Sequence, residues 1–81
     1  MKDIRIVVAS YGWVFVGEYS AEGSAVKLTR ASVVRVWGTD KGLGQLALSG
    51  PTPNTILDPC GVVEIPTASV VASIAVRSDW L

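Results

Sequence analysis

The residues best suited to chemistry gather in one glycine-rich stretch, VWGTDKGLGQLALSGP, at positions 36–51. Glycines near the start of a helix leave backbone N–H groups open, and a helix N-terminus favours negative charge. Such N–H groups, together with cations, can hold a phosphate while an aromatic ring stacks on the attached base. The stretch, together with Arg35 directly before it, therefore predicts a site for an anionic nucleotide, formed by Arg35, Trp37, Thr39 and Lys41.

A second pair of aromatic residues, Tyr11 and Trp13, flanks a glycine in an expected hairpin turn. We expect one of them, from the same or an adjacent subunit, to form a second stacking wall for the ligand. The alternative is structural: Tyr11 and Trp13 are half-buried hairpin aromatics, and Trp37 anchors a glycine-rich helix packed across a barrel mouth. The stretch at 36–51 matches neither the P-loop nor the GxGxxG pattern, so the motif alone does not decide.

Most catalytic and metal-binding arrangements are excluded by composition. The chain has no His and a single Cys, which excludes His-based triads, His-ligated metals and multi-thiolate zinc sites. Asp40 and Asp58 are not spaced as a catalytic pair, because both occupy positions where turns and caps favour Asp. Cys60, between Pro and Gly, is expected to be a small buried filler in a turn. We therefore predict a protein that is not an enzyme and needs no metal or cofactor.

The length and charge of the chain limit the kinds of partner that it can bind. The 81 residues suffice for one domain, with seven Lys+Arg against seven Asp+Glu and only 17% charged residues. So low a charged fraction in so small a domain predicts a homo-oligomer that buries apolar surface against its own copies. The basic residues between 24 and 41 are too sparse for the extended stripe that binding of duplex nucleic acid needs. The longest uncharged stretch, 42–57, is too short and too rich in Pro to span a membrane. The unpaired Cys60 and the absence of a signal-peptide pattern favour the cytoplasm.

The elements that would position these residues are mostly strands. Alternating apolar residues predict strands at 4–9, 13–19, 25–29, 31–37, 62–65 and 69–76, with a brief pairing at 56–58. The spacing of Leu43, Leu46 and Ala47 predicts a short helix at 40–49, capped by Thr39 or Asp40 and ended by Gly50-Pro51. The uncharged strand at 69–76 is expected to be covered on both faces, and a contact between subunits would provide this cover. The fold class is mainly β: a small barrel or sandwich of about six short strands with one short helix.

Three segments resemble a family of very short bacteriophage and prophage proteins. They read VKLTRASVVRVWG, GLGQLALSGP and LDPCGVVEIP, matching the family pattern VxLxxAxxVRxWG, GLGxLAxxGP and LDPxGxVEIP. In size and architecture such proteins are similar to viral sponges, oligomers that sequester cyclic nucleotide messengers of bacterial anti-phage defence without cutting them. The resemblance implies a cyclic di- or trinucleotide ligand and a location in the cytoplasm of the infected host. A small structural or assembly protein of a phage is the alternative, and a single-stranded nucleic-acid binder is a third, which zero net charge disfavours.

Overall fold

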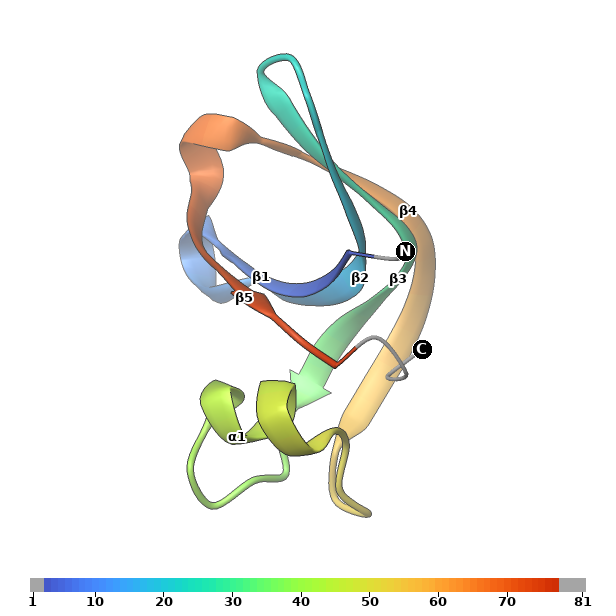
Figure 1. The fold of residues 1–81 in the computed structure, drawn as a ribbon, viewed down its shortest axis with the longest axis vertical. Helices are drawn as coiled ribbons and strands as arrows, with labels where there is room; N and C mark the ends of the chain where they lie inside the picture. The colour runs from blue at the N-terminus through green and yellow to red at the C-terminus, as the bar shows by residue number, and fades with distance from the viewer. Residues whose placement is uncertain (1–2, 78–81) are drawn as a thin grey trace.

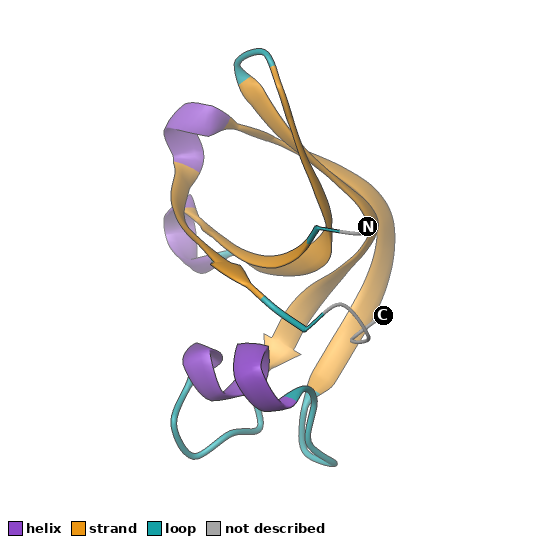
Figure 2. Ribbon diagram, viewed as in Figure 1, coloured by secondary structure: helices purple, strands orange, loops and turns teal. Residues whose placement is uncertain are grey.

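The computed structural model describes residues 3–77 and shows a mainly β protein. Five strands form one antiparallel sheet in the order β4-β3-β2-β1-β5. The sheet curls around a central space, and the helix α1 lies at one end of it (Figures 1 and 2). The sheet is not closed, because β4 and β5 remain its two edges. The elements are β1 (Ile4–Ala9), η1 (Ser10–Gly12), β2 (Val14–Glu22), β3 (Ala25–Val36), α1 (Leu43–Ser49), β4 (Ile56–Pro66), η2 (Thr67–Ser69) and β5 (Val70–Ala75).

The predicted mainly β class with one short helix is confirmed. The expected barrel or sandwich fits only loosely, because the single sheet is open, and it has five strands where about six were expected. The predicted strands at 25–29 and 31–37 form the single strand β3. Arg30 interrupts the alternation with a φ of 52°, and the register with β4 shifts between Leu28 and Ala31. Gly17 lies opposite this irregularity, where a Cβ atom would come within 3.0 Å of the Thr29 carbonyl oxygen. The irregularity in β3 thus bends the ladder without ending it.

The edge strand β4 corrects a second expectation. The segments at 56–58 and 62–65 belong to one strand, in which Ala31 pairs with Gly61 and Ser32 with Pro59. Cys60 is therefore an extra residue in the ladder, as in a β-bulge. Its side chain is exposed, so the expectation of a buried filler is wrong. The local sequence favoured a turn, but pairing with β3 keeps the segment extended.

Two apolar clusters lie on the two faces of the sheet. β1 alternates between them, because Ile4 and Ile6 belong to the first cluster and Val7 and Ala9 to the second. The predicted alternation in the second strand is also confirmed, since Val14 and Val16 are buried in the first cluster while Phe15 packs on the second. The first cluster consists of Ile4, Ile6, Val14, Val16, Val34, Leu46 and Ala47, and the second of Val7, Ala9, Leu28, Ala31 and Ile65.

The helix α1 covers the first cluster with the residues that its spacing predicted. Leu46 and Ala47 are buried, and Leu43 packs partly buried against the same cluster. The helix begins at Leu43, later than the expected residue 40, because Gly42 has a φ of 81° that no helical residue adopts. At the other end, the Gly50 N–H donates to the Leu46 carbonyl oxygen at 2.9 Å, as the predicted glycine stop requires. No helix among residues 3–77 is long and apolar enough to cross a membrane.

Candidate functional site: an aromatic pocket beside the second cluster

An apolar pocket of about 270 Å³ opens where β1 turns into β2. Ala9 ends β1, η1 makes the turn, and the Ala9 N–H donates to the Trp13 carbonyl oxygen at 2.8 Å to close it. The rest of the lining comes from the end of β4 and from η2. The Ser10 hydroxyl links η1 to η2, because it donates to the Ser69 carbonyl oxygen at 3.3 Å. Three aromatic residues, Tyr11, Trp13 and Phe15, line the near side.

Trp13 and Phe15 form a stacked pair in this wall. Their ring planes are 2° from parallel and their centroids lie 5.7 Å apart. Both side chains point to the same face, because Trp13 has an extended backbone that leads into β2, and residues two apart in an extended segment do so. Phe15 packs on the second cluster, whereas Trp13 keeps 53% of its surface exposed. The Phe15 ring therefore supports the Trp13 indole, more than half of which is exposed to solvent.

Tyr11 is held at the pocket rim in an unfavourable backbone conformation. Its φ of 65° and ψ of 24° lie in the left-handed region, which costs a residue other than Gly about 1–2 kcal/mol. Its side chain is 100% exposed, so the ring contributes no packing that would offset this cost. Strained residues concentrate at functional sites, and a strained, fully exposed aromatic ring at a pocket rim is consistent with ligand contact.

The charge in this pocket suits a neutral ring better than a phosphate. Glu64 is the one charged residue among those that line the pocket. It lies opposite Lys27 in the β3–β4 register, where opposite charges favour each other. A phosphate in the pocket would meet a carboxylate and no lining cation, whereas a flat base would meet aromatic rings. The lining of the pocket therefore suits a flat, uncharged ring better than a phosphate.

The residues predicted at the start of the helix are largely engaged with the protein itself. Arg35 forms a two-point ion pair with Asp58, with Nε 2.7 Å from Oδ2 and Nη2 3.4 Å from Oδ1. This hydrogen bonding, and then the attraction of the Asp58 charge, raise the pKa of Arg35 above its ordinary value. Thr39 does not cap the helix as predicted, because its hydroxyl donates to the Gly42 carbonyl oxygen at 2.8 Å.

Lys41 and Trp37 are exposed, as is Arg35, whose side chain keeps 61% of its surface exposed despite its ion pair with Asp58. The Lys41 side chain lines a second pocket of about 490 Å³ with Asp40, Gln45, Leu48 and Ser49, and its backbone N–H donates to Gln45 Oε1 at 2.8 Å. Trp37 is 43% exposed. Asp40 offsets the charge of Lys41 in this pocket, and no ring lines it. The larger pocket thus offers an anionic nucleotide neither a net positive charge nor a stacking surface.

The structure does not bring the six predicted site residues together within one chain. Tyr11 and Trp13 line the aromatic pocket and Lys41 lines the second pocket, whereas Arg35, Trp37 and Thr39 line neither. The aromatic pocket lies beside the second cluster and α1 covers the first, so pocket and helix lie on opposite faces of the sheet. A shared site would need residues from two subunits, which stays a prediction.

A threonine brace, missed in the sequence, fixes the two loops around α1. Thr52 donates to the Gly38 carbonyl oxygen at 2.6 Å, and Thr55 donates to the Trp37 carbonyl oxygen at 2.7 Å. The Thr52 N–H in turn donates to the Thr55 hydroxyl at 2.9 Å. Gly38 permits this approach, because a Cβ atom there would lie 2.4 Å from the Asn54 carbonyl carbon. The polar side chains of the loop at 52–55 are of a kind that can contact a base. Here Thr52 and Thr55 instead hold this loop to the backbone at residues 37–38.

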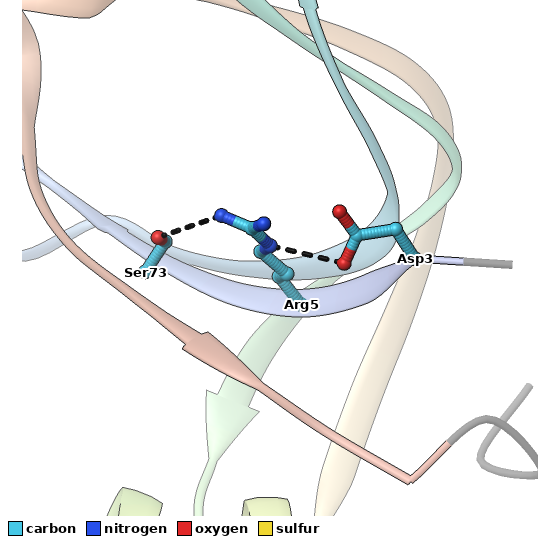
Figure 3. Close-up of polar contacts among 3 residues, drawn as sticks. All are labelled: Asp3, Arg5 and Ser73. Carbon is cyan, nitrogen blue, oxygen red and sulfur yellow. Dashed lines mark hydrogen bonds and ion pairs between the residues drawn. The ribbon is translucent and has the colours of Figure 1, made fainter.

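Arg5 forms a second unpredicted polar cluster, which joins three strands. Its Nε lies 3.0 Å from Asp3 Oδ1, and its Nη1 donates to the Ser73 hydroxyl at 3.4 Å (Figure 3). The guanidinium also lies 4.0 Å from the centroid of the Tyr19 ring on β2. The hydrogen bond to Asp3 is the main cause that raises the pKa of Arg5. Only the strand register brings Ser73 to this cluster, so the local sequence gave no signal for it.

Comparison with known proteins adds no relative. No family model matches the chain, and no curated protein is significantly similar to it in sequence. Among residues 3–77, no group of three or more His, Cys, Asp or Glu side chains is placed to hold a metal ion.

Proposed function

We propose that this chain is a non-catalytic binding protein that takes the base of a nucleotide in the aromatic pocket. The observation that carries the proposal is the exposed Trp13 indole, stacked on Phe15 and flanked by the strained, fully exposed Tyr11. A base between such rings gains about 1–3 kcal/mol from stacking, with little dependence on its identity. This site replaces the helix start, whose Arg35 and Thr39 already have protein partners.

The pocket size fits one base with its phosphates outside. Pockets that enclose a whole small ligand measure about 300–1,000 Å³, and this one measures about 270 Å³. A ligand with several bases and a charged backbone would insert one base and leave the remainder at the surface. The resemblance to phage proteins supports a cyclic di- or trinucleotide as that ligand, sequestered as an immune signal in the cytoplasm of the infected host. The low charged fraction supports a homo-oligomer, in which each copy would engage one base.

Calorimetric titration tests the proposal. Mononucleotides and cyclic mono-, di- and trinucleotides are titrated into the wild type, Tyr11→Asn, Trp13→Ala and Arg35→Ala. Loss of a stacking ring worth about 1–3 kcal/mol predicts a loss of affinity of about 5- to 150-fold for Tyr11→Asn or Trp13→Ala.

Arg35→Ala is the control that separates the two regions. We expect its affinity to stay within about twofold of wild type, because Arg35 is engaged by Asp58 and does not line the pocket. Binding lost in Arg35→Ala but retained in both pocket variants would contradict the proposal and restore the helix start as the site. Absence of binding to every nucleotide would also contradict it.

A role as a small assembly protein of a phage is the second candidate function. The observation that favours it is the exposed apolar surface on the edge strands, where Val62 is 60% and Val71 is 70% exposed. Such surface suits contact with another protein. A chain that binds no nucleotide but forms defined assemblies would support this candidate over the first.

A further inference from the structure

The edge strand β5 has the features of a strand that lacks a neighbour. It is hydrogen-bonded to β1 on one side, and no other strand among residues 3–77 pairs with it on the other. Its six residues, VVASIA, contain no charged residue and no Pro. Val71 is 70% exposed, although it is one of the larger apolar residues of the strand. An uncharged, apolar edge of this kind readily pairs with another strand.

The backbone groups on the free side of β5 can be named from the ladder. The Val76 N–H donates to the Ile4 carbonyl oxygen at 3.0 Å, so residue 76 points toward β1. Alternate residues in an antiparallel strand point both backbone groups to the same side. Ile74 and Ala72, paired with Ile6 and Val8, therefore also point toward β1. The N–H and C=O groups of Ser73 and Ala75 point away from it, toward the free edge.

The other edge, β4, carries prolines and charged residues, which β5 lacks. It contains Pro59 and Pro66, two acidic residues, Asp58 and Glu64, and the bulged Cys60. Proline, charge and bulges are the devices by which natural edge strands avoid pairing. β5 has an irregularity of its own at Val71, where its register with β1 shifts, but it carries neither proline nor charge. It is therefore the edge more open to a further strand.

We propose that β5 pairs antiparallel with β5 of a second copy of this chain, so that two sheets join across a two-fold axis. In such a pair each residue of β5 lies near the β5 residues of the other copy. Because β5 has no charged residue, no like charges would face each other across the axis. A two-fold contact of this kind buries the same surface on both copies and closes without exposing a new edge. The inference goes beyond nucleotide binding and does not depend on it.

Two matched lysine variants test the surface. Val71→Lys adds a charge to the proposed contact, whereas Val62→Lys adds the same charge to a similarly exposed valine on the protected edge. By light scattering at high micromolar concentration, we expect twice the mass of one chain for wild type and Val62→Lys, and the mass of one chain for Val71→Lys. Circular dichroism and thermal unfolding check that each variant is folded.

A proline variant provides the second, independent test. Ala75→Pro removes an N–H that faces the free edge and leaves the pairing with β1 intact, so it should also yield a folded single chain. Should Val71→Lys fail to fold, Ala75→Pro decides the question. A wild type with the mass of one chain at every concentration would overturn the proposal. So would a folded Ala75→Pro or Val71→Lys that keeps the wild-type assembly, or a loss of assembly in Val62→Lys equal to that in Val71→Lys.

Discussion

The aromatic pocket and the threonine brace differ in how many contacts their side chains make with the rest of the protein. In the brace, Thr52 and Thr55 are bonded to the backbone of Gly38 and Trp37, and Arg35 nearby is paired with Asp58. In the pocket, Tyr11 is fully exposed and Trp13 is more than half exposed. The brace uses its residues to hold the loops around α1, whereas the pocket displays rings that the fold does not require.

In so small a protein, function is better sought at side chains that the fold leaves exposed than in the stretch with the most glycines. The glycine-rich stretch at 36–51 serves the fold, because Gly38 allows close backbone approach, and Arg35, directly before the stretch, is paired with Asp58. The pocket residues look ordinary in sequence but retain unused contact surface. The comparison predicts that changes in the brace affect stability and that changes in the pocket affect binding.

Gly38→Ala should have the largest effect on stability. A Cβ at this position would lie 2.4 Å from backbone atoms of Asn54 and Thr55, and the φ of 66° disfavours any residue with a Cβ. Overpacking costs about 1–3 kcal/mol and the left-handed backbone adds to it, so we expect a loss of at least about 2 kcal/mol. Urea unfolding measures it, and Gly23→Ala, also at positive φ but with open space around it, is the control. Equal losses in both variants would show that close approach at Gly38 contributes nothing.

Thr52→Val should have the next largest effect. It removes the hydroxyl that donates to the Gly38 carbonyl oxygen and accepts from the Asn54 N–H, at nearly unchanged shape. Leaving part-buried groups without partners costs about 1–3 kcal/mol of unfolding free energy. Thr67→Val is the matched control, since its exposed hydroxyl takes part in no side-chain hydrogen bond among residues 3–77. A Thr52→Val protein as stable as Thr67→Val would contradict the brace.

Gly44→Ala sharpens the account of the glycine-rich stretch. Nothing lies within 4 Å of a Cβ at Gly44, and the residue is inside α1. Alanine should therefore raise the free energy of unfolding by up to about 1 kcal/mol, the difference in helix propensity between the two residues. A higher melting temperature with unchanged nucleotide affinity is the expected result. A loss of affinity would instead mean that a ligand approaches the backbone at Gly44, as a site at the helix start requires.

Tyr11→Asn should have the smallest effect on stability. Asparagine tolerates the left-handed conformation that Tyr11 adopts, and no packing is lost with a fully exposed ring. We expect stability equal to wild type or higher by less than about 1 kcal/mol, measured by thermal unfolding. Destabilisation by more than this would show that Tyr11 serves the fold, and the contrast between pocket and brace would fail.

The sequence predicted what depends on periodicity and missed what depends on distant pairing. The first strand, the burial of Leu46 and Ala47, and the two faces of the second strand follow from apolar spacing, and all are confirmed. The Arg35–Asp58 pair and the exposure of Cys60 depend on the register between β3 and β4, which no local pattern specifies. The late start of α1 depends on the backbone of Gly42, which the favourable caps Thr39 and Asp40 obscured.

The most direct test of the proposed site is to follow the tryptophan side chains by NMR during nucleotide titration. The chain contains three Trp residues, whose indole N–H signals can be assigned with Trp13→Phe and Trp37→Phe. If a base stacks in the aromatic pocket, the Trp13 signal should shift in a saturable manner while the Trp37 signal stays in place. A saturable shift of Trp37 with Trp13 unmoved, or no shift of Trp13 at millimolar nucleotide, would contradict the account.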